Sequence, residues 1–152
     1  MKEIKTLSIC NTEEAIDLYR LMIEEYKTID TRLQKVAIDE KSMRNLLQSS
    51  FDLENYLFFL LYINNEAVGF INSSRVSTAN EKDSWCIKAM YLLEKYRIFP
   101  NFELLVYKTE KEVMQKKVCS IVSTALPFDD RTNAFWNSLN YEIEGNTRSK
   151  EL

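Results

Sequence analysis

The residue types that most often carry out catalysis are scarce in this sequence. It contains no histidine, which removes Ser–His and Cys–His nucleophile pairs, histidine as a general base and most zinc chemistry. Only two glycines are present, so a function that needs a glycine-rich loop must be carried out in another way. The three cysteines, Cys10, Cys86 and Cys119, lie far apart in apolar segments and form no Cys-x-x-Cys pair, so we expect three buried free thiols. We expect no metal site.

Length and composition indicate one domain that spans residues 1–152. Apolar residues make up 45% and charged residues 28% of the 152 residues, which is near the average of globular proteins. The net charge is only −3 and the basic residues are scattered, so we expect no nucleic-acid partner. The longest apolar run, Leu57–Ile63, is far shorter than the roughly 20 residues of a membrane span, and Met1–Cys10 lacks the pattern of a secretory signal. We therefore expect a cytoplasmic protein that does not interact with membranes.

The first part of the chain is expected to contain a strand and two helical regions. The strand is predicted over Lys2–Ile9, and Asn11 followed by Glu14 has the spacing of an N-cap and capping box. Apolar residues then recur at helical spacing from Ala15 to Tyr26. A second helical region, which restarts near position 39, is marked by Leu33, Val36, Ala37, Met43, Leu46 and Leu47.

The rest of the chain alternates strands and helices. The predicted order is strand Tyr56–Ile63, strand Ala67–Val76, strand Ser84–Leu93, helix 101–117, strand Val118–Leu126, helix Asp130–Leu139 and strand Tyr141–Ile143. A single helical crossover joins Ser84–Leu93 to Val118–Leu126, so these two strands should be parallel, with a right-handed connection. Short connections should make the three preceding strands antiparallel. The sequence therefore predicts an α/β (α+β) domain with a mixed sheet and helices on both faces.

Several segments, in register and in order, carry a resemblance to a known family. Residues 89–97 (AMYLLEKYR) are similar to a central strand that ends in V-x-P-E-Y-R, and residues 131–142 are similar to A-x-x-F-Y-x-x-L-G-F/Y-x. Glu103–Lys117 fits the helix between these motifs, and the ending through Leu152 resembles a short last strand. Over nearly its whole length the chain thus resembles the GNAT N-acyltransferase superfamily. The resemblance implies a mostly antiparallel sheet whose central parallel strands are splayed apart.

The resemblance also implies where an acyl-CoA would bind. The pantetheine arm is expected to enter the gap between the splayed strands and to pair with backbone groups of Met90, Tyr91 and Leu92. The pyrophosphate is expected on the following loop and the first turn of the next helix, where N–H groups and the helix dipole favour an anion. The residues that the resemblance assigns to donor binding there are Arg97, Ile98, Phe99, Asn101, Phe102 and Asp129.

The donor loop departs from the family pattern, which reads Q/R-x-x-G-x-G/A. Here residues 97–102 read RIFPNF, so Arg97 is retained and both glycine positions are lost. Pro100 contributes no N–H donor, and Phe102 places a bulky ring where a small residue is expected. The departure concerns the affinity for the donor and not the fold.

Candidates for the acid and the base follow from the same resemblance. Trp136 occupies the position at which the family often has a tyrosine acid, and its indole N–H is no practical acid, so Tyr141 is the substitute. Both residues are also explained as core aromatics. Some relatives place a glutamate base near the position of Cys86, where this chain has no carboxylate. The base candidates by rough position are Asp83, Glu66 and Asp129, each of which is also explained as a turn, surface or helix-capping carboxylate.

Three functions are compatible with these observations. The first is an enzyme that transfers an acetyl group from acetyl-CoA to an amine by direct attack in a ternary complex. The second is a GNAT-shaped binding or regulatory protein that no longer uses acetyl-CoA, and the third is a structural subunit of a homodimer. The sequence does not identify the amine, which belongs to a small molecule or a protein. Acidic residues of the first two helices that could attract a cationic amine, or form a solvated helix face, are Glu24, Glu25, Asp39 and Glu40.

Overall fold

A computed structural model describes residues 1–31, 34–35, 39–76, 83–124, 132–144 and 147–152. The helices are α1 (Thr12–Ile29), α2 (Glu40–Ser49), α3 (Phe99–Met114) and α4 (Thr132–Ser138), with short 3-10 turns η1 (Ile9–Asn11) and η3 (Glu94–Tyr96). The strands are β1 (Lys2–Thr6), β2 (Tyr56–Ile63), β3 (Glu66–Val76), β4 (Ser84–Leu92), β5 (Ser120–Ser123), β6 (Glu142–Glu144) and β7 (Thr147–Glu151). None of the helices in these ranges is long and apolar enough to cross a bilayer.

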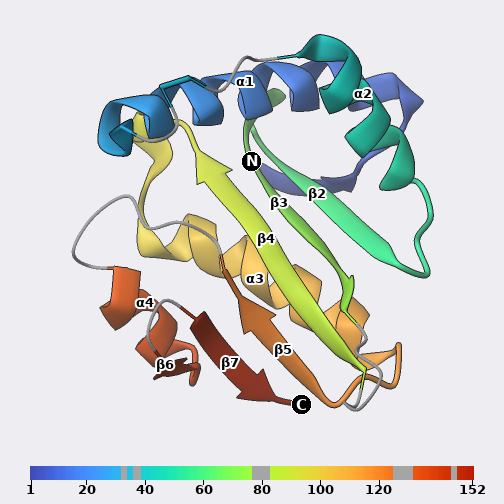
Figure 1. Ribbon diagram of the computed structural model, residues 1–152, viewed down its shortest axis with the longest axis vertical. Coiled ribbons are helices and arrows are strands. Elements are labelled where there is room, and N and C mark those ends of the chain that lie inside the picture. Colours follow the sequence, from blue (N-terminus) through green and yellow to red (C-terminus); the bar gives the residue numbers. More distant parts are fainter. Residues whose placement is uncertain (32–33, 36–38, 77–82, 125–131, 145–146) are drawn as a thin grey trace.

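The strands form one sheet in the order β1-β2-β3-β4-β5-β7-β6 (Figure 1). β4 and β5 pair in parallel, and the other neighbours pair antiparallel. Asn64 and Asn65 both have positive φ, of 51° and 67°, and form the turn of the predicted hairpin between β2 and β3. The mixed sheet with its parallel central pair is therefore confirmed.

Two apolar clusters lie on opposite faces of this sheet, because successive strand residues point to opposite sides. One cluster joins α1 and α2 to Phe58, Leu60 and Phe70 of β2 and β3. The other joins α3 and α4 to Phe59, Leu61 and residues of β3, β4 and β5. The prediction of helices on both faces is confirmed, and β4 contributes side chains to both clusters.

The start of the chain differs from the prediction in its capping. β1 ends at Thr6, and the capping box belongs to the turn η1: the Ser8 hydroxyl accepts from the N–H of Cys10, and Asn11 Oδ1 accepts from the N–H of Ser8 at 2.8 Å. Asn11 makes no side-chain cap to α1, and the Glu14 carboxylate instead accepts from the Tyr62 hydroxyl. The predicted box between Asn11 and Glu14 is wrong because β2 offers Glu14 a partner that the local spacing does not reveal.

Other expected boundaries and burials also change. α3 begins at Phe99, two residues earlier than expected, because a proline is tolerated in the first turn of a helix. Of the three cysteines only Cys86 is buried. Cys10 is exposed in η1, and Cys119 is exposed between the buried Val118 and the start of β5. Predicted positions 33, 36–37, 125–126 and 129–131 lie outside the described residues.

Candidate functional site

The two parallel strands at the centre of the sheet separate part of the way along β4. β5 pairs with β4 only from Ser84 to Ile87, and the last bond between them runs from the Thr124 N–H to the Ile87 carbonyl at 3.0 Å. β4 continues through Lys88–Leu92 with β3 as its partner. Among the described residues no strand pairs with this stretch on the β5 side, and Figure 1 shows β4 running well past the end of β5. One edge of the upper half of β4 is thus bare of strand partners in the described chain.

A bulge lies where the separation begins. Ile87 and Ala89 of β4 pair with consecutive residues of β3, so Lys88 is the extra residue. The bulge reverses which side chains face which helices. On the α3 side lie Trp85, Ile87, Met90 and Leu92, and on the α1 side lie Ala89 and Tyr91. Beyond the bulge, the strand turns away from β5 with Met90 and Leu92 beneath α3.

The loop after β4 uses its own N–H groups internally. Within η3 the Tyr96 N–H donates to the Leu93 carbonyl at 2.8 Å, and the Arg97 N–H donates to the Glu94 carbonyl at 3.2 Å. The Ile98 N–H then donates to the Tyr96 carbonyl at 2.9 Å. These groups therefore do not form the open set of donors that a pyrophosphate needs.

The first turn of α3 offers few donors as well. Pro100 has no N–H, and the N–H groups of Asn101 and Phe102 donate to the Ile98 carbonyl at 3.0 and 3.4 Å. Asn101 is buried, and its Nδ2 donates to the Tyr96 carbonyl at 2.8 Å. Its Oδ1, an acceptor, is buried without a hydrogen-bond partner among the described residues. The turn does not fit a pyrophosphate, because an anion needs donors there.

Arg97 points away from this turn and toward α1. Its two terminal nitrogens donate to Glu25 Oε1 and Oε2 at 2.6 and 2.5 Å, and its Nε donates to the Leu92 carbonyl at 2.8 Å. The hydrogen bonds and charge of Arg97 lower the pKa of the Glu25 carboxyl, against the opposing effect of burial. The one loop residue that keeps the family pattern is thus engaged in a bidentate ion pair that joins α1 to the end of β4.

The two aromatic candidates for an acid lie in the core. Trp136 is 1% and Tyr141 is 2% exposed, and their ring centroids are 4.8 Å apart in an edge-on arrangement. The Tyr141 hydroxyl has no hydrogen-bond partner in the described part of the chain. Burial, with a smaller effect from the Glu110 carboxylate, raises the pKa of Tyr141. The geometry agrees with the alternative that both residues are core aromatics.

A second aromatic group occupies the α3 side of the loop. Phe99 and Phe102 are partly buried and pack on Phe135, with ring centroids 5.4 and 5.7 Å from it. Phe135 is in turn packed edge-on against Trp136 at 5.2 Å. Side chains therefore occupy the place at which the family pattern has glycines.

The candidate base residues are not brought together. Asp83 directly precedes β4 and pairs with Arg75 at 3.1 Å, whereas Glu66 begins β3 and therefore lies near the opposite end of β4. The Tyr96 hydroxyl is 3.5 Å from a Glu66 carboxylate oxygen. Asp129 lies outside the described residues. The described ranges contain no group of three or more histidine, cysteine, aspartate or glutamate side chains arranged to hold a metal ion.

The acidic residues expected at an acceptor wall all have partners. Glu24 lies 3.9 Å from Lys27, and Glu25 is held by Arg97. Asp39 caps α2 by accepting from the Lys41 N–H and the Ser42 hydroxyl. Glu40 pairs with Arg44 at 2.8 Å. Their arrangement in pairs and caps is that of a solvated helix face.

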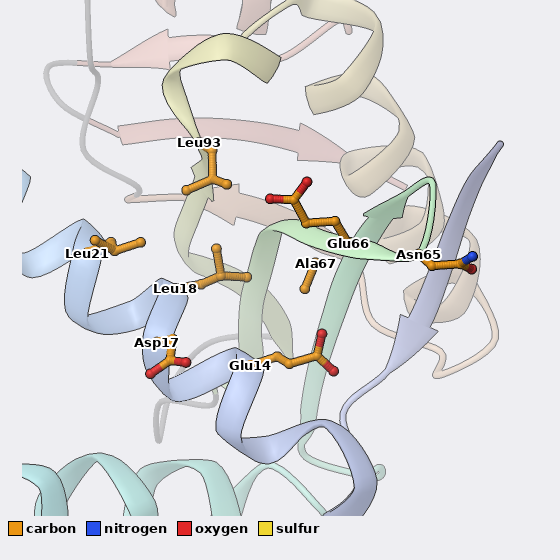
Figure 2. A pocket seen from close by; sticks show the side chains of 8 residues that line it. All are labelled: Glu14, Asp17, Leu18, Leu21, Asn65, Glu66, Ala67 and Leu93. Atoms are coloured by element: carbon orange, nitrogen blue, oxygen red, sulfur yellow. The ribbon is translucent and has the colours of Figure 1, made fainter.

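An open groove that the sequence analysis did not identify lies between α1 and the hairpin of β2 and β3 (Figure 2). Figure 2 shows leucines between the two elements, with the carboxylates of Glu14 and Glu66 beside them. The residues that line it are Glu14, Asp17, Leu18, Leu21, Asn65, Glu66, Ala67 and Leu93. Positions 14, 17, 18 and 21 have the spacing of one helix face, which is the only sequence signal for this groove.

Comparisons with known proteins bear on the fold. No protein-family profile and no curated protein sequence matches the chain. A GNAT-family acetyltransferase from Streptococcus pneumoniae superposes with a TM-score of 0.78 at 12% identity, over 100% of both chains. PaiA N-acetyltransferase from Thermoplasma acidophilum, solved with coenzyme A, gives 0.68 at 16% identity, over 100% of this chain and 99% of that one.

A third solved structure carries an analogue of both substrates. AAC(6')-Iy, in complex with the bisubstrate analogue CoA-S-monomethyl-acetylneamine, superposes with a TM-score of 0.75 at 12% identity, over 94% of this chain and 92% of that one. These identities are too low to carry function, but the superpositions cover nearly complete chains. This chain has the fold of the GNAT acetyltransferases.

Proposed function

We propose that this protein is an N-acyltransferase that takes an acyl group from a pantetheine thioester, such as acetyl-CoA, and passes it to an amine. The observation that carries the proposal is the bare edge of β4 over Lys88–Leu92, beyond the last bond to β5. A pantetheine arm contains two amide groups, so it can pair with such an edge as an added strand does. Met90 and Leu92 are the residues whose backbone groups face this edge, since the Tyr91 carbonyl is turned toward Gly69 of β3. The Leu92 carbonyl already accepts from Arg97 Nε, so Leu92 would contribute its N–H.

The proposed chemistry depends on positioning more than on side chains. The amine nitrogen attacks the thioester carbonyl carbon, the new C–N bond forms, and the C–S bond breaks. The thiol leaves with the proton that the nitrogen loses. A backbone N–H of β4 near the bulge at Lys88 would polarise the carbonyl, and the walls of the gap would hold both reactants in line. Trp136 and Tyr141 support the α3–α4 wall from within the core and do not donate a proton.

Two structural neighbours support this class of donor and acceptor. PaiA was solved with coenzyme A, and AAC(6')-Iy was solved with an analogue that joins CoA to an acetylated amine. For this chain the acceptor is an amine of a small molecule or of a protein. A cationic amine suits the acidic α1 surface, on which Glu14 and Asp17 line the groove of Figure 2.

A non-catalytic binding or regulatory protein is the second candidate. It is favoured by one observation, the loop of residues 93–102. Five of its N–H groups, those of Tyr96, Arg97, Ile98, Asn101 and Phe102, donate within the loop, and its Arg97 is paired with Glu25. A protein that no longer uses an acyl donor would have no need of a phosphate cradle.

Thiol release from acetyl-CoA distinguishes these two functions. We expect release that depends on an added amine, measured with a panel of polyamines, aminoglycosides and lysine peptides, with reactions lacking amine as the control. We also expect acetyl-CoA to raise the melting temperature, since a ligand at about a hundred times its Kd adds roughly 2.7 kcal/mol of stability. If no amine promotes thiol release and millimolar acetyl-CoA leaves the melting temperature unchanged, the result counts against acetyl-CoA as the donor and favours the non-catalytic function.

A further inference from the structure

We propose that the protein recognises its donor through the acyl-pantetheine arm alone and makes no use of the 3′-phospho-ADP part of CoA. The inference rests on the proposed function. It implies that a 4′-phosphopantetheine thioester, free or attached to a carrier protein, serves at least as well as acyl-CoA.

The half of the site that would hold the arm is intact. Within the described part of the chain, no strand pairs with Lys88–Leu92 on the β5 side of β4, and this stretch begins at the bulge. Alternate residues of a strand turn their backbone groups to one edge, so Met90 and the Leu92 N–H are the groups that an extended chain would meet here, because the Leu92 carbonyl accepts from Arg97 Nε. Met90 and Leu92 provide buried apolar side chains beneath it on the α3 side.

The half that would hold the pyrophosphate is missing its donors. Anion sites at helix N-termini depend on N–H groups that have no partner within the helix. Here the N–H groups of Arg97, Ile98, Asn101 and Phe102 each donate to a carbonyl of the same loop, and Pro100 has none. Residues 97–102 therefore offer the Phe99 N–H as the one donor outside these bonds, which is fewer than a pyrophosphate cradle needs.

Charge and space at this loop also disfavour phosphates. Residues 93–102 contain two cations, Lys95 and Arg97. Arg97 is neutralised by Glu25, and the Lys95 ammonium lies 4.8 Å from the centroid of the Tyr96 ring. Phe99 and Phe102 fill the α3 side with rings packed on Phe135. Phosphates placed here would meet rings and the buried Asn101 acceptor in place of donors.

The transfer itself needs only the thioester end of the donor. The acyl carbon leaves the pantetheine sulfur and bonds to the amine nitrogen, and the pantetheine thiol carries away the nitrogen's proton. No atom of the nucleotide takes part. A protein that does not recognise the nucleotide therefore binds acyl-CoA less tightly but catalyses the same transfer.

A series of donors with the same acetyl-pantetheine arm tests this inference. The series is S-acetyl-pantetheine, S-acetyl-4′-phosphopantetheine, acetyl-CoA and a carrier protein that bears acetyl-phosphopantetheine. We expect kcat/KM for acetyl-CoA within about 3-fold of that for S-acetyl-pantetheine, because no charge-assisted bond to the nucleotide is gained. If kcat/KM for the acetylated carrier protein is at least 10-fold higher than for both free donors, the protein-bound thioester is the preferred donor. Equal kcat/KM values would indicate that the free thioester is sufficient.

A strong preference for acetyl-CoA over S-acetyl-pantetheine would contradict the inference. Two charge-assisted hydrogen bonds to phosphate would favour acetyl-CoA over S-acetyl-pantetheine by more than about 100-fold, and a preference of that size would overturn the inference while leaving the acyltransferase intact. If no member of the series reacts or binds, the acyltransferase proposal itself is wrong. Calorimetric Kd values for non-reactive thioether analogues of the same donors give a readout that does not depend on turnover, and the Kd of the CoA analogue should vary little with salt.

A variant that restores the family pattern provides the matched comparison. Pro100→Gly combined with Phe102→Ala would return one N–H donor and open the α3 side of the loop. We expect this double variant to bind the CoA analogue at least about 10-fold more tightly relative to the pantetheine analogue than the native protein does. An unchanged ratio in a folded double variant would mean that these two residues are not what excludes the nucleotide.

Discussion

At the scale of single residues, the orientation of the Arg97 side chain is the main feature of the candidate site. The family pattern identifies this arginine in the sequence, but not its partner, because Glu25 lies 72 positions earlier in the chain. The Glu25 carboxylate accepts hydrogen bonds from both terminal nitrogens of the guanidinium, and the Leu92 carbonyl accepts one from Nε. A residue of the expected type is thus found in an ion pair that joins the end of β4 to α1.

The ion pair makes a prediction about stability and pH. Arg97 lowers the pKa of Glu25 from its usual value of 4.5. A carboxyl whose folded-state pKa is depressed contributes stability above its unfolded-state pKa and loses it as pH falls through the folded-state pKa. We expect Glu25→Gln to be less stable than the native protein by roughly 1 kcal/mol at neutral pH, since the pair is partly exposed. Measured by urea unfolding, the difference should shrink as pH falls below 4.5 and vanish once pH has fallen below the folded-state pKa of Glu25.

Glu24→Gln is the control for this measurement. Glu24 is the neighbouring carboxylate, its side chain is 59% exposed and its distance from Lys27 is 3.9 Å. We expect no measurable change from it at either pH. A Glu25→Gln difference of the same size in acid and at neutral pH would show that the pair's charge is not its source.

Residue types alone could not decide between the catalytic and core roles of Trp136 and Tyr141. Both roles need an aromatic ring at these positions, and they differ only in exposure. The structure buries both side chains among apolar residues of α3 and α4. This burial depends on long-range packing, which one sequence does not contain, and the catalytic role of the two residues stays a prediction.

At the scale of elements, β4 was predicted almost to the residue, but its shape was not. The expected strand Ser84–Leu93 is observed as Ser84–Leu92, because an apolar run of this length is a strong strand signal. The bulge at Lys88 was missed because period-two reasoning assumes unbroken alternation. Its one signal is the exposed lysine within an otherwise buried stretch. The existence of the strand can thus be predicted from its residue types. The bulge cannot, because it depends on how β4 is aligned with β3.

Gly69 of β3 gives a prediction for this part of the sheet. It pairs with Leu92, and an added Cβ would lie under 3.0 Å from the Tyr91 carbonyl oxygen and the Leu92 side chain. A backbone oxygen cannot rotate away, so β3 and β4 would have to separate. We expect Gly69→Ala to lower the free energy of unfolding by about 1–3 kcal/mol, measured by urea denaturation.

The control is Ser74→Ala, on the same strand at a partly exposed position. It should change the free energy of unfolding by less than about 0.5 kcal/mol. A Gly69→Ala protein as stable as the native one would show that β3 and β4 are not closely packed beside Leu92.

At the scale of the whole molecule, the order of elements and the two-faced sheet followed from periodicity, short connections and the crossover rule. The position of β7 between β5 and β6 did not follow from the sequence, because a last strand was expected but its neighbours in the sheet were not predicted. The gap beside β4 was expected from resemblance, and its place at Ile87 comes from the pairing with β5. The groove of Figure 2 combines residues about 50 positions apart, such as Glu14 and Glu66, so it can be recognised only in the folded chain.

The central claim is that the bare edge of β4 holds the arm of an acyl-pantetheine thioester. The most direct measurement is amide hydrogen exchange, resolved by residue with NMR, with and without a non-reactive S-acetyl-pantetheine analogue. Amides of Lys88–Leu92 on the β5 side should exchange more slowly in the presence of the analogue, because the arm supplies the missing partners, while amides of α2 should not change. Bound analogue with unchanged exchange along β4, or protection confined to other elements, would contradict the claim.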